Sequence, residues 1–234
     1  KNGQAVTPDS SKAGTYDIAA FGLRASENYN EIVYRKGKLT VAGATVMPFV
    51  DVASGAYYED AVLWAVNYGI TAGTDESHFS PNVGCTRAQV VSFLWRAAGK
   101  PEPKSSKNPF VDVSSDSYYY KAVLWAAENG IVYGTDATHF SPNASCTRAQ
   151  VVCFLYRYQG NPAHGSGNPF RDVSGGAYYY DAVLWAEQNG VVYGTDASHF
   201  SPNKTCTRGQ VVCFLYRYRN SPGHGTANPF LDVE

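Results

Sequence analysis

The sequence contains one segment that returns at a nearly fixed spacing, and this repetition limits the fold more than any single motif does. The pentapeptide PFVDV at 48–52 recurs as PFVDV at 109–113, PFRDV at 169–173 and PFLDV at 229–233. The aspartates of these four copies follow one another at steps of 61, 60 and 60 residues. Such a period indicates similar structural units that pack against each other. We expect complete units at 48–107, 108–167 and 168–227, and the start of a fourth at 228–234.

Each complete unit has the pattern of two helices joined by a loop. The sequence AVLWA, present once in every unit, predicts a first helix, over roughly 118–129 in the second unit. Gly130 and Ile131 follow as a terminating glycine and its hydrophobic contact. Beyond a loop rich in turn-forming residues, apolar side chains at i, i+3, i+4 and i+7 predict a second helix over 148–158. Two helices cannot bury their apolar faces alone, so we predict a mainly α fold in which three units close around a pseudo-threefold axis.

The first 47 residues have a different pattern. The stretches TYDIAAFGL and EIVYRKGKLTVAG are rich in β-branched and aromatic residues that partly alternate, which predicts a small β-rich segment. The sequence RKGK at 35–38 is typical of a hairpin turn. The chain begins at Lys1 rather than at Met, which indicates a processed or excised piece of a longer protein.

The composition argues against two classes of partner. The net charge is −1, from 19 basic and 20 acidic residues, whereas nucleic acids and anionic membranes require a basic surface. The sequence has no apolar run long enough for a transmembrane helix. Eighteen tyrosines against one methionine, with 17% charged residues, are typical of an extracellular surface protein.

The second helix of each unit begins with a cysteine, a threonine and an arginine. The copies are CTRAQVV at 85–91, CTRAQVV at 146–152 and CTRGQVV at 206–212. The threonine is a natural N-cap, and glutamine three residues later completes a capping box. We expect Gln89, Gln150 and Gln210 to be structural, whereas the threonines that begin these helices are also candidate ligand-binding residues: Thr86, Thr147 and Thr207.

An arginine directly behind the cap lies at the positive end of the helix dipole, where an acidic residue is favoured. We expect the first turn to present free backbone N–H groups beside this arginine, which together form a site for a planar anion such as a carboxylate. The arginines are Arg87, Arg148 and Arg208. The alternatives are pairing with the repeated aspartates (Asp51, Asp112, Asp172), for which we favour a structural role, or exposure to water.

The repeats resemble the S-layer homology family. In words, its pattern is Phe-x-Asp-Val, an aromatic pair with Ala-Val-x-x-Ala, Gly-Ile, Gly, Phe-x-Pro and Thr-Arg-Ala-Glu, and here it takes the form FVDV, YYYKAVLWA, GI, G, FSP and TRAQ. The match covers about three quarters of the chain in three tandem copies. It implies a three-lobed pseudo-trimer with a central three-helix bundle, and noncovalent anchoring to a secondary cell-wall polysaccharide that commonly bears pyruvylated amino sugars. It also implies that the motif's arginine contacts the glycan.

The chain departs from the family pattern at three places. Glutamine replaces the glutamate of the Thr-Arg-Ala-Glu motif in every copy, Gly209 replaces its alanine in the third, and tyrosine replaces the leading tryptophan of the first helix. Because the glutamine carries no charge, the arginine has no anion within its own motif. Residues before about 45 are similar to the closing strands of small β-grasp-like repeats of bacterial surface proteins, which implies the tail of a stalk module.

Sugar recognition also needs aromatic surfaces. The candidates are the pairs at the start of each first helix, Tyr57/Tyr58, Tyr118/Tyr119 and Tyr178/Tyr179, for which core packing is the alternative. The mid-helix tryptophans Trp64, Trp125 and Trp185 are expected in the core.

No metal site, cofactor or catalytic centre is expected. The five cysteines contain no CxxC pair and are interpreted as buried free thiols, with disulfides between units as the alternative. His78, His139 and His199 occur once per unit, so the threefold arrangement separates them. Neither a phosphate-binding loop nor a nucleophile motif is present.

These observations favour a noncatalytic, secreted cell-wall anchoring module that binds an anionic, pyruvylated secondary cell-wall polysaccharide in grooves between units. We expect it to be a monomeric pseudo-trimer from a Gram-positive type of bacterium. The alternative is a structural or adhesive module that binds protein, and a glycan hydrolase would require carboxylates in one groove that the others lack.

Overall fold

The computed structural model describes residues 14–18, 37–41 and 46–220, which belong to two compact units. One unit contains strands β1 (Gly14–Ile18) and β2 (Gly37–Val41), which pair antiparallel with Ile18 opposite Gly37. The turn predicted at RKGK is wrong in its second half, because Gly37 and Lys38 lie inside β2. Residues 35 and 36, and the predicted start of a fourth repeat at 228–234, lie outside the described residues.

The other unit, Met47–Pro222, is helical over its described part. Its helices are α1 (Glu59–Asn67), α2 (Arg87–Ala97), α3 (Tyr120–Glu128), α4 (Arg148–Tyr158), α5 (Tyr180–Gln188) and α6 (Arg208–Tyr218). α4 has the predicted bounds, whereas α3 begins two residues later than expected. A turn in which the Tyr120 N–H donates to the Ser117 carbonyl precedes α3 and leaves Tyr118 outside the helix.

Glycine ends the first helix of the second repeat as the sequence predicts. Gly130 has a φ of +67°, a conformation that costs glycine no steric strain. Its N–H donates to the carbonyl of Ala127, and the Ile131 N–H donates to that of Ala126. This pair of bonds is a Schellman motif, and it delivers Ile131, which is 2% exposed, into the core.

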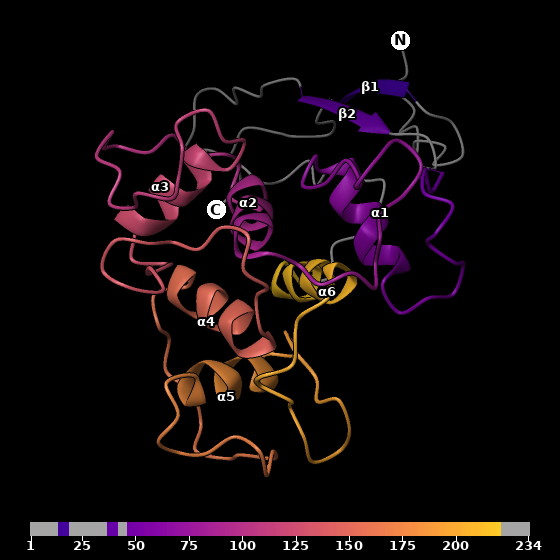
Figure 1. The fold of residues 1–234 in the computed structure, drawn as a ribbon. Helices are drawn as coiled ribbons and strands as arrows, with labels where there is room; N and C mark the ends of the chain where they lie inside the picture. The colour runs from indigo at the N-terminus through magenta and orange to yellow at the C-terminus, as the bar shows by residue number, and fades with distance from the viewer. Residues whose placement is uncertain (1–13, 19–36, 42–45, 221–234) are drawn as a thin grey trace, which may run out of the picture. The chain divides into compact units, whose positions relative to one another are not determined.

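The repeats close into a ring. α3 packs on α2, α5 on α4 and α1 on α6, so the first helix of each repeat covers the second helix of the repeat before it (Figure 1). The contact between α1 and α6 joins the last repeat to the first. Three helix–loop–helix repeats in pseudo-threefold arrangement are therefore confirmed.

Three cysteines lie at the centre of this ring, directly before α2, α4 and α6. The Cys85 N–H donates to the Cys206 carbonyl, Cys146 to Cys85, and Cys206 to Cys146, each over 2.9 Å. Every repeat thus gives one backbone hydrogen bond to one neighbour and receives one from the other. This cycle fixes the relative register of the three helix starts.

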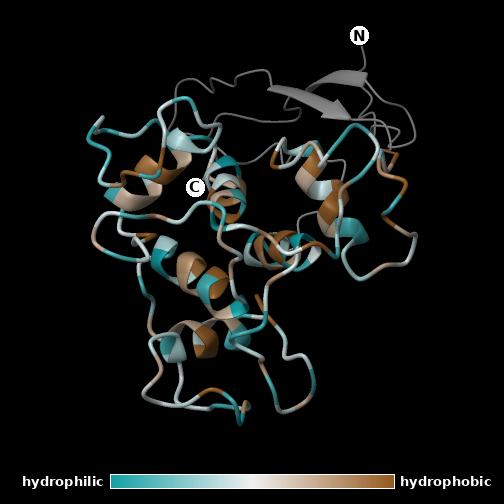
Figure 2. Ribbon diagram, viewed as in Figure 1, coloured by the Kyte–Doolittle hydropathy of each residue, from teal (hydrophilic) through white to brown (hydrophobic). Residues whose placement is uncertain are grey.

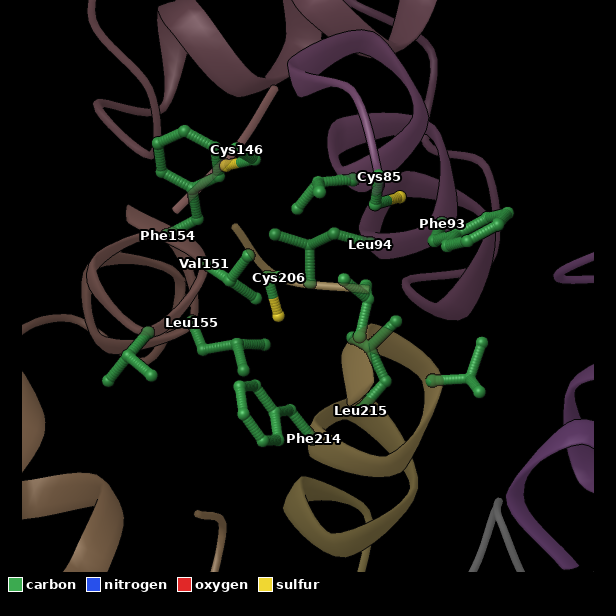
Figure 3. Packing of buried hydrophobic residues seen from close by; sticks show 14 of the residues in the cluster. Cys85, Phe93, Leu94, Cys146, Val151, Phe154, Leu155, Cys206, Phe214 and Leu215 are labelled. Atoms are coloured by element: carbon green, nitrogen blue, oxygen red, sulfur yellow. The ribbon is translucent and has the colours of Figure 1, made fainter. Parts of the chain in front are cut away.

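Below the cysteines, the second helices fill the axis with leucine and valine. Leu94, Leu155 and Leu215 point toward one another in Figure 3, and together with the valines and Phe154 around them they leave no room for a water molecule. Hydrophobic residues concentrate on the helices, while the loops are mostly polar (Figure 2). The predicted core tryptophans are buried, with exposures of 2%, 6% and 5% for Trp64, Trp125 and Trp185.

Among the described residues, no helix has the length and apolar composition needed to cross a membrane.

Candidate functional site

The predicted capping boxes are present at the start of all three second helices. The Thr86 hydroxyl accepts from the Gln89 N–H over 3.3 Å, and the Gln89 side chain accepts from the Thr86 N–H over 3.0 Å. Glutamine performs this reciprocal bond without a negative charge. The caps therefore determine where α2, α4 and α6 begin.

The first-turn N–H groups, which we expected to be free for a ligand, already have partners. The Arg87 N–H donates to the Ala144 carbonyl over 2.9 Å, and the Ala88 N–H donates to the Pro142 carbonyl over 3.0 Å. α4 and α6 donate to the next repeat's loop in the same way. The expectation of a vacant backbone anion site is wrong, because ring closure presses the neighbouring loop's carbonyls onto each helix start.

The arginines behind the caps connect neighbouring repeats. Arg148 is 3% exposed; its Nε donates to the Phe200 carbonyl over 2.9 Å, and its Nη2 donates to the Tyr193 carbonyl over 2.8 Å. Arg87 makes the same bonds to Phe140 and Tyr133. The partners are thus neither an aspartate nor water, which were the two alternatives considered.

Aromatic rings complete the surroundings of these guanidiniums. The Arg148 Cζ lies 4.7 Å from the centre of the Phe200 ring and 5.4 Å from that of Phe214. Burial lowers the pKa of Arg148, as it does for Arg87 and Arg208. The intrinsic pKa of arginine is so high that the side chain stays charged. Carbonyl dipoles and π faces therefore stabilise a cation at the positive end of a helix.

The repeated aspartates indirectly support the hydrogen bonds between the buried arginines and the neighbouring loops. Asp172 accepts from the N–H groups of Phe200 and Ser201, each over 2.8 Å, and Asp51 and Asp112 do the same in their repeats. Ser201 has a φ of +58°, which is strained for a serine. The carboxylate stabilises this turn and with it the Phe200 carbonyl that binds Arg148.

The leading tyrosines of the first helices lie on the surface near the arginines. Tyr57, Tyr118 and Tyr178 are 61%, 62% and 68% exposed, and each packs edge-on against the next tyrosine in the chain. Partial burial raises the pKa of each phenol. Tyr178 interacts electrostatically with Arg87, Tyr57 with Arg148 and Tyr118 with Arg208. The structure therefore brings together the predicted arginine and tyrosine candidates, each pair from two different repeats.

Two pairs of side chains at these places were missed by the sequence-based predictions. The Arg157 Cζ lies 4.7 Å from the centre of the Tyr133 ring, and the Arg217 Cζ lies 4.6 Å from that of Tyr193. Both tyrosines are exposed. Two sequence features could have indicated these pairs. One is the tyrosine of VYGTD in an otherwise polar loop, and the other is the arginine of YRY at the end of the second helix.

We name the three places by the repeats that the central arginine joins. The 1–2 junction contains Arg87, Tyr133, Arg157 and Tyr178. The 2–3 junction contains Arg148, Tyr193, Arg217 and Tyr57. The 3–1 junction contains Arg208, Arg96, Tyr118 and, in place of the stacked tyrosine, Ala72.

The 3–1 junction has a different loop. Thr71, where the other repeats have valine, accepts from the Gly73 N–H through its hydroxyl over 3.2 Å, and Gly73 takes a φ of +89°. Arg208 donates from Nε to the Phe79 carbonyl, but its Nη2 is buried without a partner among the described residues. The carbonyl of Ala72 thus does not replace those of Tyr133 and Tyr193.

Gly209 leaves room for the side chain of Tyr58, which belongs to the first repeat of the same chain. A Cβ at this position would lie 3.1 Å from the Pro81 carbonyl oxygen and 3.2 Å from the Tyr58 ring. Tyr58 is 9% exposed, whereas the corresponding Tyr119 and Tyr179 are half-buried. Glycine therefore allows Tyr58 to pack closely where the other repeats have alanine.

The remaining candidates are structural. His78, His139 and His199 are exposed, and each bonds through Nδ1 to an aspartate three residues earlier, Asp75, Asp136 or Asp196. Backbone N–H donors, followed by the histidine, lower the pKa of these aspartates to about 2. The five cysteines are buried free thiols, and no group of described His, Cys, Asp or Glu residues is arranged to hold a metal ion.

Comparison with known proteins gives one family for the helical unit. The sequence model of the S-layer homology domain matches residues 48–91, 109–152 and 169–212, which together are more than half of the chain.

Several curated proteins are similar to parts of the chain. The Surface-layer 125 kDa protein of Lysinibacillus sphaericus is 31% identical over 172 residues, which are 72% of this chain and 14% of that protein. The Cell surface protein of Thermoanaerobacter kivui is 28% identical over 190 residues, 79% of this chain and 23% of that protein. An Endoglucanase of Bacillus sp. (strain KSM-635) is 35% identical over 121 residues, 52% of this chain and 13% of the enzyme. The chain therefore spans less than a quarter of the length of each.

Proposed function

Because the chain belongs to the S-layer homology domain family, we propose that it binds an anionic, pyruvylated secondary cell-wall polysaccharide at its inter-repeat junctions. The chain is a cell-surface anchoring module, as its family and its relatives named as surface-layer and cell surface proteins indicate. Its location is accordingly the cell surface or cell wall. We also propose that the protein is secreted and acts as a monomeric pseudo-trimer. The repeats of this pseudo-trimer are proposed to span residues 48–107, 108–167 and 168–227.

The observation that carries the proposal is the meeting of exposed tyrosines and arginines at the junctions. At the 1–2 junction, Tyr178 interacts electrostatically with Arg87, and the guanidinium of Arg157 stacks over the Tyr133 ring. Tyrosine presents a flat apolar face to a sugar ring and a hydroxyl for hydrogen bonding. Arginine binds a carboxylate through paired N–H donors. A pyruvyl ketal on a sugar combines the two complementary features, a ring and a carboxylate.

In this proposal the cap residues and buried arginines have supporting roles. Thr207 interacts with the side chain of Tyr57, so this cap supports one of the exposed tyrosines. Arg87, Arg148 and Arg208 supply positive charge close to the surface while their hydrogen bonds connect the repeats. The module is noncatalytic, and the resemblance to an endoglucanase involves only 13% of that enzyme.

Sedimentation with purified cell walls tests the proposal. We expect the chain to sediment with untreated walls and to remain in solution with walls from which mild acid has removed pyruvyl groups. A variant with Tyr57→Ala, Tyr118→Ala and Tyr178→Ala should bind at least tenfold more weakly. Val111→Ala, at a residue 75% exposed and outside the junctions as defined above, is the control.

Alanine substitution of the buried arginines is unsuitable for this test, because it would disturb the contacts between repeats. Equal sedimentation with untreated and depyruvylated walls would overturn anion recognition. Binding to walls that is abolished by protease treatment of the walls would instead support the alternative, a protein-binding module.

A further inference from the structure

The three junctions differ chemically, and we infer that the 1–2 and 2–3 junctions bind the glycan through their tyrosine–arginine stacks whereas the 3–1 junction does not. This inference rests on the proposed function and adds to it the specificity-determining residues: Tyr133 with Arg157, and Tyr193 with Arg217. The chain would then bind two sugar ligands rather than the three that its repeat number suggests.

Each stack combines a fixed cation with an open aromatic surface. The guanidinium of Arg157 lies over the Tyr133 ring, and one of its terminal nitrogens also approaches the Ile131 carbonyl at 3.5 Å. Tyr133 nevertheless keeps 61% of its surface exposed. A stacked guanidinium has its N–H donors directed from its edge, where a carboxylate can accept two of them. The neighbouring ring is free to pack against a sugar.

The backbone beneath the stack is also held in place. The Tyr133 carbonyl accepts from Arg87 Nη2 over 2.8 Å, and the Tyr193 carbonyl accepts from Arg148 Nη2 over 2.8 Å. The buried arginine of one repeat therefore positions the tyrosine of the next. This connection gives the buried arginines a role in binding that does not require them to touch the ligand.

The 3–1 junction lacks the tyrosine of the stack. Ala72 supplies no ring for Arg96, although Nη1 of Arg96 donates to the Ile70 carbonyl over 3.0 Å, as that of Arg157 does to the Ile131 carbonyl. The bond from the Gly73 N–H to the Thr71 hydroxyl holds the loop in a different conformation. The unpaired Nη2 of Arg208 does not compensate, because that atom is buried from solvent and a ligand cannot reach it without moving the loop.

Titration calorimetry with the methyl glycoside of a pyruvylated N-acetylhexosamine tests the inference. We expect two sites per chain for the unmodified protein and one site each for Tyr133→Ala and Tyr193→Ala. The double variant should bind at least a hundredfold more weakly. Val111→Ala, at a residue 75% exposed and outside the junctions, should retain two sites. Thermal unfolding verifies that each variant is folded.

A gain of binding provides the complementary test. Replacing Thr71→Val and Ala72→Tyr together restores the sequence of the other two loops, and a third site should appear. Three equal sites in the unmodified protein, or two undiminished sites in the double variant, would overturn the inference while leaving glycan binding intact. Wall binding that does not change when the pyruvyl groups are removed would instead count against the proposed function itself.

Discussion

Around the axis the three repeats place the same residue types at corresponding positions, whereas at the junctions two repeats agree and one differs. The axial layer consists of Val90, Val151 and Val211 with Leu94, Leu155 and Leu215. The junction loops contain Val-Tyr-Gly in the second and third repeats and Thr-Ala-Gly in the first.

The difference follows from how many neighbours each residue has. A side chain on the axis meets its two counterparts at once, so a change in volume in one repeat disturbs all three, and tightly packed interiors tolerate such changes poorly. A junction joins one helix start to one loop, and its stacked tyrosine is exposed. One junction can therefore change chemically while the ring stays closed.

The largest expected effect is a loss of folding stability at high pH, caused by the buried thiols of the core. Burial raises the pKa of Cys85 and Cys146 to about 12 and that of Cys153 and Cys213 to about 11. In the unfolded chain thiols ionise from about pH 8.5, so the unfolded state loses protons that the folded state keeps. Stability is then fully present below about pH 8.5 and falls as pH rises, by up to about 1.4 kcal/mol per pH unit for each buried thiol.

Urea unfolding at pH 7.5, 9 and 10 measures this loss, under reducing conditions. A Cys153→Ala, Cys213→Ala variant should show a shallower pH dependence, which separates the thiols from titrating tyrosines and lysines. Rapid reaction of the folded protein with a thiol reagent at pH 8 would contradict the expected protection.

Truncation on the axis should be the next largest effect. Leu155→Ala removes a side chain that is 2% exposed and lines the axis together with residues of α2 and α6. The resulting cavity should lower the free energy of unfolding by about 3–5 kcal/mol. Val111→Ala, at a residue 75% exposed, should change it by less than about 0.5 kcal/mol. Similar losses for the two variants in chemical denaturation would show that the axis is not the shared core.

The repeat architecture was predictable because its signals are local and occur three times. α4 occupies the predicted 148–158, and the capping boxes and the Gly130 helix end follow from motifs only a few residues long. Ring closure was also predictable, since no single unit could bury its apolar stripes. The RKGK turn was wrong in its second half because Gly37 and Lys38 pair with Ile18 and Asp17 of β1, and composition does not encode that register.

The candidate site was predicted in part. The sequence indicated that Arg148 needs a partner outside its own motif, but it could not show that backbone carbonyls 45 and 52 residues later would supply it. Backbone carbonyls are present at every position and leave no mark in a sequence. The Tyr193–Arg217 stack was missed for a related reason. The two residues are far apart in the sequence, and only the fold shows that they are in contact.

Substitution of the buried arginines should lower the free energy of unfolding by different amounts at different junctions. Arg148→Ala leaves the carbonyls of Phe200 and Tyr193 without their donor and should cost about 2–3 kcal/mol. Arg208→Ala removes one such bond and also an unpaired buried donor, so its cost should be about 1 kcal/mol smaller. Chemical denaturation of both variants measures the difference. Equal losses would mean that Arg208 has a second partner of equal strength.

Ser92 offers the smallest and most specific comparison among the repeats. It is 2% exposed, and its hydroxyl has no partner in the part of the chain that the structure describes, whereas the other two repeats have buried Cys153 and Cys213 at this position. Cysteine behaves as a small hydrophobic residue there, so Ser92→Cys should raise the free energy of unfolding by about 1 kcal/mol.

Ser92→Ala separates the two contributions to this gain. Alanine removes the unsatisfied hydroxyl without filling the volume of a sulfur atom, so it should stabilise the protein less than cysteine does. If alanine and cysteine stabilise equally, the desolvated hydroxyl alone distinguishes the first repeat from the others. If both destabilise, the Ser92 hydroxyl has a partner in solution, and the first repeat is as well satisfied at this position as its two neighbours.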